Sequence, residues 1–449
     1  MRSATRQTSA RAPQFLHCAG KFKGPHGPIN RYLLVCVRPF ADSDGMTTMV
    51  QKISWFAPGQ PQILPLSVAL LVLMGGVVYL SDEVGGRQAA LYLIGGALGI
   101  SLYHAVFGFT GAYRRLLVEG RGSGVRAQLI MLAAASLVFA PLLASGSVFG
   151  QSLSGALAPI GVSVMAGAFI FGAGMQLGGG CGSGTLFTAG GGSTRMMVTL
   201  IGFIAGSLAG SAHLPWWVEQ PKIAAVSLYN ELGWPGGLVL QLAFITALAV
   251  VTIRIERKRH GTLEKRESVA SWKEVFQRLL FGRWPILWGA IALAILSVAT
   301  LLVAGRPWGI TWGYTLWGAK IADAAGLDVA AWAFWQWPYP ARMLNAGIEQ
   351  DVTSVMNIGI VLGAALAASL AGRFAPLMRI PPLSLAAALI GGLLLGYGAR
   401  LAFGCNIGAF VSGVVSGSLH GWVWIIFGLL GTFAGIYLRP LFGLKGVEN

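Results

Sequence analysis

Long apolar stretches, broken by short polar or basic segments, dominate the chain. Residues 127–194 contain no Asp, Glu, Lys or Arg in 68 positions, and residues 401–438 add another 38 such positions. A helix that crosses a bilayer needs about 20 consecutive apolar residues, so each stretch holds one or more passes together with the turns between them. The pattern predicts an all-α polytopic membrane protein.

The apolar stretches divide into about 9–11 transmembrane helices. We expect six of them in the first part of the chain, at 63–80, 89–109, 127–149, 157–177, 196–212 and 236–253. Four more are expected at 284–304, 352–370, 380–398 and 419–438, and the depth of a Trp-rich stretch at 308–337 is left open. Glycine-rich segments that follow 157–177 and 380–398 are predicted to re-enter the membrane.

Two polar segments define the domain organisation. Residues 1–54 form a basic tail with eight Lys or Arg; it is either disordered or precedes a true start at Met46 or Met49. Residues 254–283 carry nine Lys or Arg and four Glu, which predicts a basic cytoplasmic linker. The predicted transmembrane half-repeats are therefore 55–253 and 284–449.

The charge distribution argues against a soluble protein and against a nucleic-acid-binding protein. Only 11% of the 449 residues are charged and 55% are hydrophobic, whereas soluble domains are about 25% charged. The net charge of +16 comes largely from Lys and Arg in short segments beside the apolar stretches. Such residues orient membrane helices with these segments toward the cytoplasm. We expect a multi-pass protein of the bacterial inner (plasma) membrane. Its partner is then the lipid bilayer, and we expect it to bind no nucleic acid.

One motif occurs twice in the chain. The segments GAGMQLGGGCGSG at 172–184 and GYGARLAFGCNIG at 396–408 agree at six positions with one offset of 224 residues. The agreeing pairs are Gly172/Gly396, Gly174/Gly398, Leu177/Leu401, Gly180/Gly404, Cys181/Cys405 and Gly184/Gly408. The agreement indicates an internal duplication that presents one cysteine in each half.

The basic segments predict that the two copies enter the membrane from opposite sides. If Arg114 to Arg126 lie inside, the third span runs outward and the fourth returns, which leaves Cys181 toward the cytoplasm. If Arg373 and Arg379 lie inside, the span before Cys405 runs outward. This is the pattern of an inverted-topology repeat, whose substrate site lies near the membrane midplane between the halves.

Glycines around the two cysteines predict irregular backbone. They are Gly180, Gly184, Gly404 and Gly408. Glycine adopts non-helical angles and permits close approach, and such backbone is tolerated at membrane depth only inside protein or beside a polar cavity. The free N–H groups of a helix that begins there attract small anions. Tight packing of helices through small residues is the alternative explanation of these glycines.

The cysteine segments favour binding over catalysis. Neither Cys181 nor Cys405 has His, Asp or Glu at ligand spacing, and neither has a local base, so we expect no metal, no cofactor and no enzymatic activity. A polarisable thiol in a narrow path suits a sulfur-containing solute. Three other residues are candidates for this path: Arg400, which either neutralises an anion or anchors at the interface, its counterpart Gln176, and Asn406, directly after Cys405.

At these motifs the chain resembles the YeeE/YedE family of sulfur transport proteins. The resemblance extends over nearly all of residues 55–443, and three segments carry it: HAVFGFTGAYRRL at 104–116, GAGMQLGGGCGSGTLFTAGGGSTR at 172–195 and GYGARLAFGCNIGAFVSGVVSGSLHGW at 396–422. The resemblance implies an hourglass of membrane helices whose re-entrant segments meet at the centre. It also implies uptake of thiosulfate, passed along by hydrogen bonds from cysteines without covalent change, and only Cys181 and Cys405 correspond to those cysteines.

One departure from the family pattern bears on the substrate. Thiosulfate-transporting members have a further path-lining cysteine in the first half, whereas this chain has none between Cys36 and Cys181. The departure puts thiosulfate in doubt more than transport itself. A related sulfur or selenium compound therefore remains an alternative substrate.

Two other functions remain open from the sequence. One is a membrane thiol/disulfide redox protein in which Cys181 and Cys405 exchange a disulfide, which requires their Cα atoms to lie within about 7 Å. The other is a membrane subunit that recruits a cytoplasmic sulfur-carrier protein through the linker at 254–283.

Overall fold

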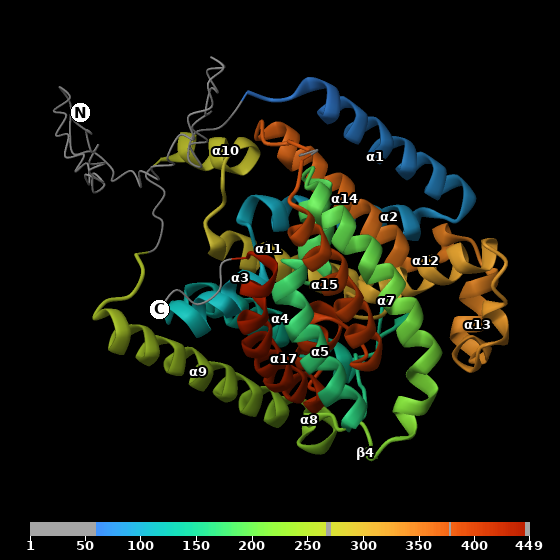
Figure 1. Ribbon diagram of the computed structural model, residues 1–449. Coiled ribbons are helices and arrows are strands. Elements are labelled where there is room, and N and C mark those ends of the chain that lie inside the picture. Colours follow the sequence, from blue (N-terminus) through green and yellow to red (C-terminus); the bar gives the residue numbers. More distant parts are fainter. Residues whose placement is uncertain (1–59, 266–270, 377–378, 445–449) are drawn as a thin grey trace, which may run out of the picture. The chain divides into compact units, whose positions relative to one another are not determined.

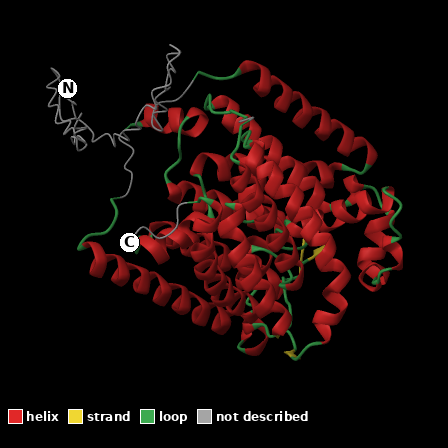
Figure 2. Ribbon diagram, viewed as in Figure 1, coloured by secondary structure: helices red, strands yellow, loops and turns green. Residues whose placement is uncertain are grey.

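A computed structural model describes residues 60–265, 271–376 and 379–444, and nearly all of its regular structure is helical (Figures 1 and 2). Ten helices among these residues are long and apolar enough to cross a membrane. This number lies within the predicted range, and the prediction of an all-α polytopic membrane protein is confirmed. The predicted N-terminal tail lies outside the described residues.

Between residues 60 and 265 the structure has ten helices and four two-residue strands. The helices are α1 (Ile63–Glu83), α2 (Gly86–Ala105), α3 (Phe109–Arg114), the π-helix η1 (Arg115–Glu119), α4 (Ser123–Ser145), α5 (Val162–Gly178), α6 (Gly182–Gly190), α7 (Thr194–Glu219), α8 (Leu228–Glu231) and α9 (Gly233–His260). The antiparallel strand pairs are β1 (Ser147–Val148) with β2 (Gln151–Ser152) and β3 (Ile160–Gly161) with β4 (Lys222–Ile223).

The second part of the described chain combines four long apolar helices with several short ones. These elements are α10 (Trp272–Phe281), α11 (Ile286–Ala304), α12 (Thr311–Ala324), η2 (Val329–Ala331), η3 (Ala333–Gln336), α13 (Pro338–Asn345), η4 (Ile348–Gln350), α14 (Val352–Leu370), α15 (Pro382–Leu401), η5 (Asn406–Val411), α16 (Ser412–Val415), α17 (Leu419–Leu438) and η6 (Arg439–Phe442).

The helices of the two halves exchange partners. Helices α5 and α15 pack against each other; α5 also packs against α17 of the second half, and α15 against α7 of the first. In the same way α2 packs on α14 and α4 on α11. Such crossed pairs are expected when two copies of one helical unit are related by a pseudo-two-fold axis.

Small residues permit the closest of these crossings. A Cβ atom at Gly172 in α5 would overlap the carbonyl oxygen of Gly428 in α17, and one at Gly396 in α15 would overlap that of Phe203 in α7. Gly172 and Gly396 are the first equivalent pair of the repeated motif. The motif's upstream glycines therefore serve helix packing.

Two long helices lie at the periphery. Large apolar side chains of α1 and α9 are exposed on the surface that membrane lipid would cover, and both helices flank the interior helices in Figure 1. Helix α9 continues through the basic residues to His260, so the first part of the segment assigned to the linker is helical. Helix α10, farther along this segment, exposes Trp272, Phe276 and Leu279.

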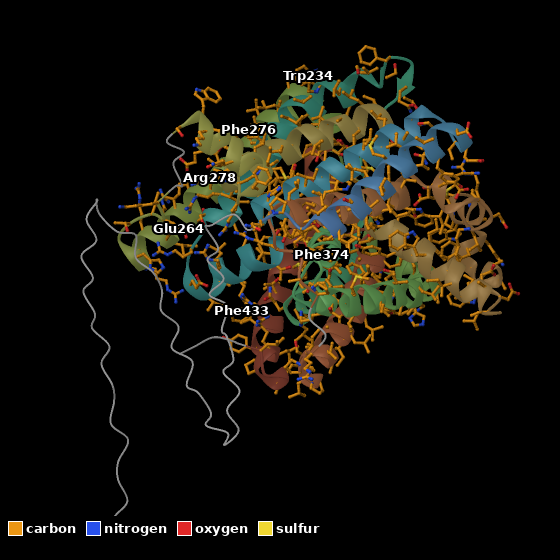
Figure 3. All side chains as sticks on the ribbon, turned by 90° about the horizontal axis from the view of Figure 1, so that it is seen from above. Trp234, Glu264, Phe276, Arg278, Phe374 and Phe433 are labelled. Atoms are coloured by element: carbon orange, nitrogen blue, oxygen red, sulfur yellow. The ribbon has the colours of Figure 1, made fainter. Side chains whose placement is uncertain are left out.

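A buried carboxylate joins the end of α9 to the loop before α4. Glu256 is fully buried and lies 3.2 Å from Arg121 and 2.7 Å from Arg126. It also accepts hydrogen bonds from the backbone N–H groups of Gly122 and Glu264. In Figure 3, nitrogen atoms of basic side chains gather around Glu264. These bonds satisfy the buried carboxylate and fix the end of α9 to the start of α4.

The second carboxylate of this cluster lies outside the helix. Partial burial of Glu264 opposes ionisation, but hydrogen bonds from Ser123 and Arg115 outweigh it and hold the pKa of this carboxyl below its usual value. A depressed pKa means that the contribution to stability is present above the carboxyl's ordinary pKa and is lost as the pH falls through the lower folded-state pKa.

Replacing the buried carboxylate tests its contribution to stability. We expect Glu256→Gln to lower the free energy of unfolding by about 1.5–3 kcal/mol, because charge-assisted hydrogen bonds from two arginines are weakened. The melting temperature in detergent measures this change. Glu119→Gln is the matched control, since Glu119 forms a half-exposed ion pair with Arg115, and such pairs contribute about 0–1 kcal/mol. Equal melting temperatures for both variants would contradict a stabilising role of Glu256.

Candidate functional site

Both cysteines occupy the same local structure, the residue that caps a short helix. Cys181 precedes α6 and Cys405 precedes η5, and each has φ −95° and ψ −166°. The Cys181 sulfur accepts a hydrogen bond from the N–H of Gly184 at 3.4 Å. Both side chains are free thiols with at most 1% of their surface exposed. The duplication seen in the sequence is therefore reproduced in the backbone conformation.

A left-handed turn precedes each cysteine. In the first copy it is formed by Gly179, with φ +86°. In the second copy its counterpart is Phe403, with φ +57°, followed by Gly404 with φ +153°. A bulky residue in the left-handed region is costly and is retained only where the surrounding structure imposes it. The turn is therefore strained in the second copy.

Side chains close the helix ends that these turns expose. Arg195 donates to the carbonyl oxygens of Leu177 and Gly178, each at 2.6 Å, and Arg439 donates to that of Gln176 at 2.7 Å. At the end of α15, Ser163 donates to the carbonyl of Leu401 at 2.7 Å. Backbone groups at the breaks are thus bonded within protein, as membrane burial requires.

The two cysteine turns meet each other. A Cβ atom on Gly182, the residue after Cys181, would lie 2.9 Å from the Cys405 sulfur. Each turn is also bonded to the opposite half. Asn406, directly after Cys405, donates to the hydroxyl of Tyr113 at 3.2 Å, and the hydroxyl of Tyr314 donates to the carbonyl of Gly182 at 3.0 Å.

These tyrosines belong to a second repeat that our sequence reasoning missed. GFTGAY at 108–113 and GITWGY at 309–314 agree at Gly, Thr and Tyr with an offset of 201 residues. The offset differs from the 224 residues that separate the cysteines, so a search at one fixed offset does not find it. We call these two segments the first and second strips.

A cavity of about 560 Å³ lies on one side of the cysteine pair. The first strip and the first cysteine turn form its walls, including Cys181, Gly180 and Gly184. Three arginines are among the described residues that line it, Arg115, Arg283 and Arg373, together with His104. They belong to the segments that the sequence places toward the cytoplasm.

A second cavity of about 160 Å³ has the equivalent walls from the second half. The second strip lines it together with Gly404 and Gly408. Arg306 and Arg400 are its charged lining residues. Positive groups in a concave, low-dielectric wall attract anions and repel cations.

The two cavities lie toward opposite ends of the same helices. In α11, Ile286 lines the larger cavity and Thr300 the smaller one, which places them about 20 Å apart along the helix axis. In α14, Thr353 near the start lines the smaller cavity, whereas Ala371 after its end lines the larger. The buried cysteine turns therefore separate two electropositive cavities that face opposite sides.

The remaining predicted residues lie around these turns. Gln176 is fully buried and donates to the carbonyl oxygen of Thr110 in the first strip at 3.4 Å. Its counterpart Arg400 lies over the rings of Trp312 and Phe334, at 5.9 and 5.3 Å from their centres. The buried Nε of Arg400 has no hydrogen-bond partner among the described residues. Arg400, in the last turn of α15, thus lines the smaller cavity.

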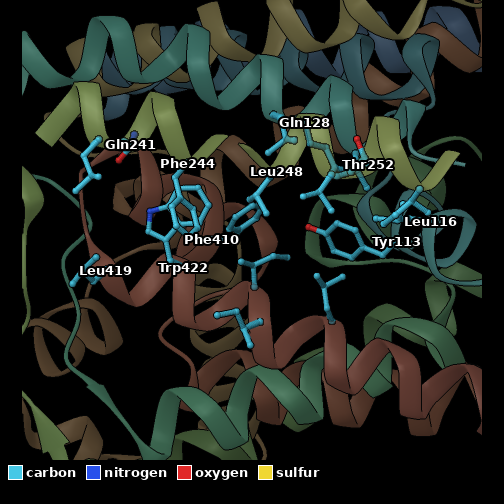
Figure 4. Close-up of a pocket in the computed structure, with 18 of the residues that line it drawn as sticks. Tyr113, Leu116, Gln128, Gln241, Phe244, Leu248, Thr252, Phe410, Leu419 and Trp422 are labelled. Carbon is cyan, nitrogen blue, oxygen red and sulfur yellow. The ribbon is translucent and has the colours of Figure 1, made fainter. Parts of the chain in front are cut away.

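A third cavity, of about 480 Å³, lies between α9, α4 and α17 (Figure 4). Apolar side chains such as Leu248 and Phe244 form most of its wall, and none of the described residues that line it is charged. Such a wall offers nothing to a small anion, so we place the candidate path in the two electropositive cavities. Among the described residues, no group of three His, Cys, Asp or Glu comes together to hold a metal.

Comparison with known proteins identifies the family. A family model described as sulphur transport matches residues 104–434, which include both cysteine turns and both strips. The chain belongs to this family. The resemblance drawn from the motifs is thereby confirmed.

Individual members of the sulphur transport family are similar over different lengths. The thiosulfate transporter TsuA of Spirochaeta thermophila is 29% identical over 77% of this chain and 98% of its own length. TsuA of Escherichia coli is 26% identical over 78% of this chain and 94% of its own length. The probable transporter YedE of Escherichia coli is 29% identical, but the match covers 38% of this chain and 42% of YedE. The chain is thus matched to less than half the length of YedE.

The glycines beside Cys405 differ in how much room surrounds them. A Cβ atom at Gly404 would lie 2.7 Å from the N of Ala409 and would require φ +153°, whereas one at Gly408 would lie 3.9 Å from its nearest neighbour. We expect Gly404→Ala to lower the melting temperature in detergent and the folded yield, because the turn cannot adopt its conformation.

The matched variant Gly408→Ala should retain the melting temperature of the parent protein. It places a methyl group at the wall of the smaller cavity, where only the size of that cavity changes. A stable Gly404→Ala protein, or equal destabilisation by both substitutions, would show that the turn before Cys405 is not conformationally restricted.

Proposed function

We propose that the protein is a permease of the bacterial inner membrane that takes up a small sulfur-containing anion, thiosulfate. One observation carries the proposal: two cavities with basic linings face opposite sides and are separated by two buried free thiols. Membership of the sulphur transport family and the similarity to two thiosulfate transporters support it. In this proposal the protein catalyses no covalent reaction.

Charge selects the solute in this proposal. Arg306 and Arg400 line the smaller cavity, and the Nε–H donor of Arg400 has no partner among the described residues. Cations are repelled from both cavities, while an anion gains charge-assisted hydrogen bonds. The helices that begin at the cysteines add N–H groups at the narrow point, where the two cysteine turns separate the cavities.

The thiols provide recognition of sulfur at the narrow point. A thiol is a weak hydrogen-bond donor with a polarisable sulfur, so it can contact the terminal sulfur of thiosulfate without reacting. Cys181 borders the larger cavity, and Cys405 lies against Gly182. We propose that the anion passes from Cys405 to Cys181, and that Gly180, Gly184, Gly404 and Gly408 keep the backbone narrow enough for both contacts.

Uptake of labelled thiosulfate into proteoliposomes tests the function and the thiols together. We expect the protein to support uptake, and Cys181→Ala or Cys405→Ala to reduce it by about tenfold or more, the effect of losing one hydrogen bond to a charged group. Competition with sulfite, sulfate and selenium analogues identifies the preferred anion. Uptake that both alanine variants retain would exclude passage by way of the thiols.

The charge in the smaller cavity has a separate test. We expect Arg400→Gln to raise the KM for the transported anion about tenfold, because one charge-assisted hydrogen bond is lost, whereas Arg400→Lys retains the charge and part of the affinity. Arg342→Gln is the control, since Arg342 is an exposed arginine that lies over Tyr339 outside the cavity lining. An unchanged KM in Arg400→Gln would assign this arginine a structural role.

A redox function is the second candidate, because the structure brings the Cys405 sulfur next to the residue after Cys181. Alkylation of the unfolded protein before and after reductant separates the two functions. A permease yields two alkylated thiols at these positions without reductant. A redox protein yields them only after a disulfide has been reduced.

We also propose that the linker at 254–283 recruits a cytoplasmic sulfur-carrier protein. The exposed apolar side chains of α10 lie within the segment at issue. Such a helix suits either a protein partner or the membrane surface.

A further inference from the structure

We propose that Tyr113 and Tyr314 act as a pair of crossed latches that hold the two cysteine turns closed, and that each latch releases its turn when an anion passes. The inference deepens the proposed transport function and rests on it for its purpose. The hydrogen bonds themselves do not depend on the identity of the solute.

The two latches correspond in sequence position and in the position of the residues that they contact. Each tyrosine ends the strip of its own half and reaches the residue that follows the cysteine of the other half. Tyr113 bonds Asn406 after Cys405, and Tyr314 bonds Gly182 after Cys181. Asn406 and Gly182 are themselves equivalent in the 224-residue repeat. The bonds differ in kind, since the Tyr113 hydroxyl accepts from the Asn406 side chain and the Tyr314 hydroxyl donates to the Gly182 backbone. Both join a strip to the cysteine turn of the opposite half.

The position of these bonds suits a latch. Tyr113 and Tyr314 are buried to within 2% of their surface, so water does not replace a hydroxyl that leaves its partner. The first strip lines the larger cavity and the second strip lines the smaller one. Each tyrosine, in contrast, holds the cysteine turn of the opposite half, which borders the other cavity. Movement of either turn away from the opposite half therefore requires one of these bonds to break.

Spare bonding capacity at the first latch points to the group that replaces the bond. The Oδ1 atom of Asn406 is buried and has no partner among the described residues. The Tyr113 hydroxyl accepts a hydrogen bond from Asn406, and its own proton has no acceptor among the described residues. A hydroxyl donor beside the thiols is able to bond an oxygen of the anion while a thiol contacts its sulfur.

The surroundings make Tyr113 the more mobile of the two. Its ring borders the apolar cavity of about 480 Å³ (Figure 4). The ring of Tyr314 instead packs between Phe203 and Trp317, with centroid distances of 4.7 and 5.6 Å. Release of Tyr113 thus displaces no packed side chain on that side, whereas release of Tyr314 requires repacking.

Rates of thiol labelling test the latches without measuring transport. The protein in proteoliposomes is treated with N-ethylmaleimide, and mass spectrometry follows the peptides that contain each cysteine. We expect Tyr113→Phe to speed labelling of Cys405, and Tyr314→Phe to speed labelling of Cys181, each by about fivefold, the effect of one net hydrogen bond. In each variant the other cysteine should keep its rate.

The crossed pattern separates a latch from general loosening. Tyr92→Phe is the matched control, because it removes a hydroxyl bonded to the carbonyl of Val72 in α1; both cysteines should keep their rates. Unchanged rates in both latch variants, or equal acceleration of both cysteines in each, would overturn the proposal. Crossed labelling without thiosulfate uptake would leave the latches in place and refute the substrate.

Discussion

The need to bond every backbone group inside the membrane governs this structure. Two membrane helices break at the cysteines, and each break exposes carbonyl and N–H groups whose partners must come from the protein or from a polar cavity. Arginines from α7 and η6 close the end of α5, while Ser163 closes the end of α15. Because these partners come from other helices, the breaks persist only within the assembled bundle. Close crossing of α5, α15, α7 and α17 is therefore a condition for the site as well as for the fold.

The repeated segments give the site its symmetry, and the positions at which they differ limit it. The cysteines have the same dihedral angles and the strips line equivalent cavities. The equivalent of Arg400 is Gln176, which holds the first strip through a hydrogen bond and carries no charge. The cavities also differ in volume, at about 560 and 160 Å³. The two directions of passage therefore encounter different charges and different spaces.

Much of the fold follows from hydrophobicity alone. Predicted spans such as 352–370 match the helices closely, since a pass through lipid leaves little freedom in length and composition. The Trp-rich stretch was not predictable in this way. Only α12, with 14 residues, forms a long helix there, and the rest consists of short helices whose aromatic rings pack together. Long-range side-chain packing of this kind has no periodic signature in the sequence.

The site was predictable where the chemistry is repeated at one offset. The motif located both cysteines and the glycines beside them. It did not locate the tyrosines, because insertions between strip and cysteine change the offset from 224 to 201 residues. It also did not distinguish Gly172 and Gly396, which allow helices to cross, from Gly404, which shapes a turn. Spacing alone does not separate these two uses of glycine.

The crossed bonds have a consequence for how such a chain evolves. Tyr113 and Asn406 are 293 positions apart in sequence, yet their side chains form a hydrogen bond with each other. A half taken from one relative and joined to a half from another would pair a strip with a cysteine turn of different ancestry. The two parts of this chain are therefore not interchangeable modules, because the contacts at the cysteine turns belong to both of them at once.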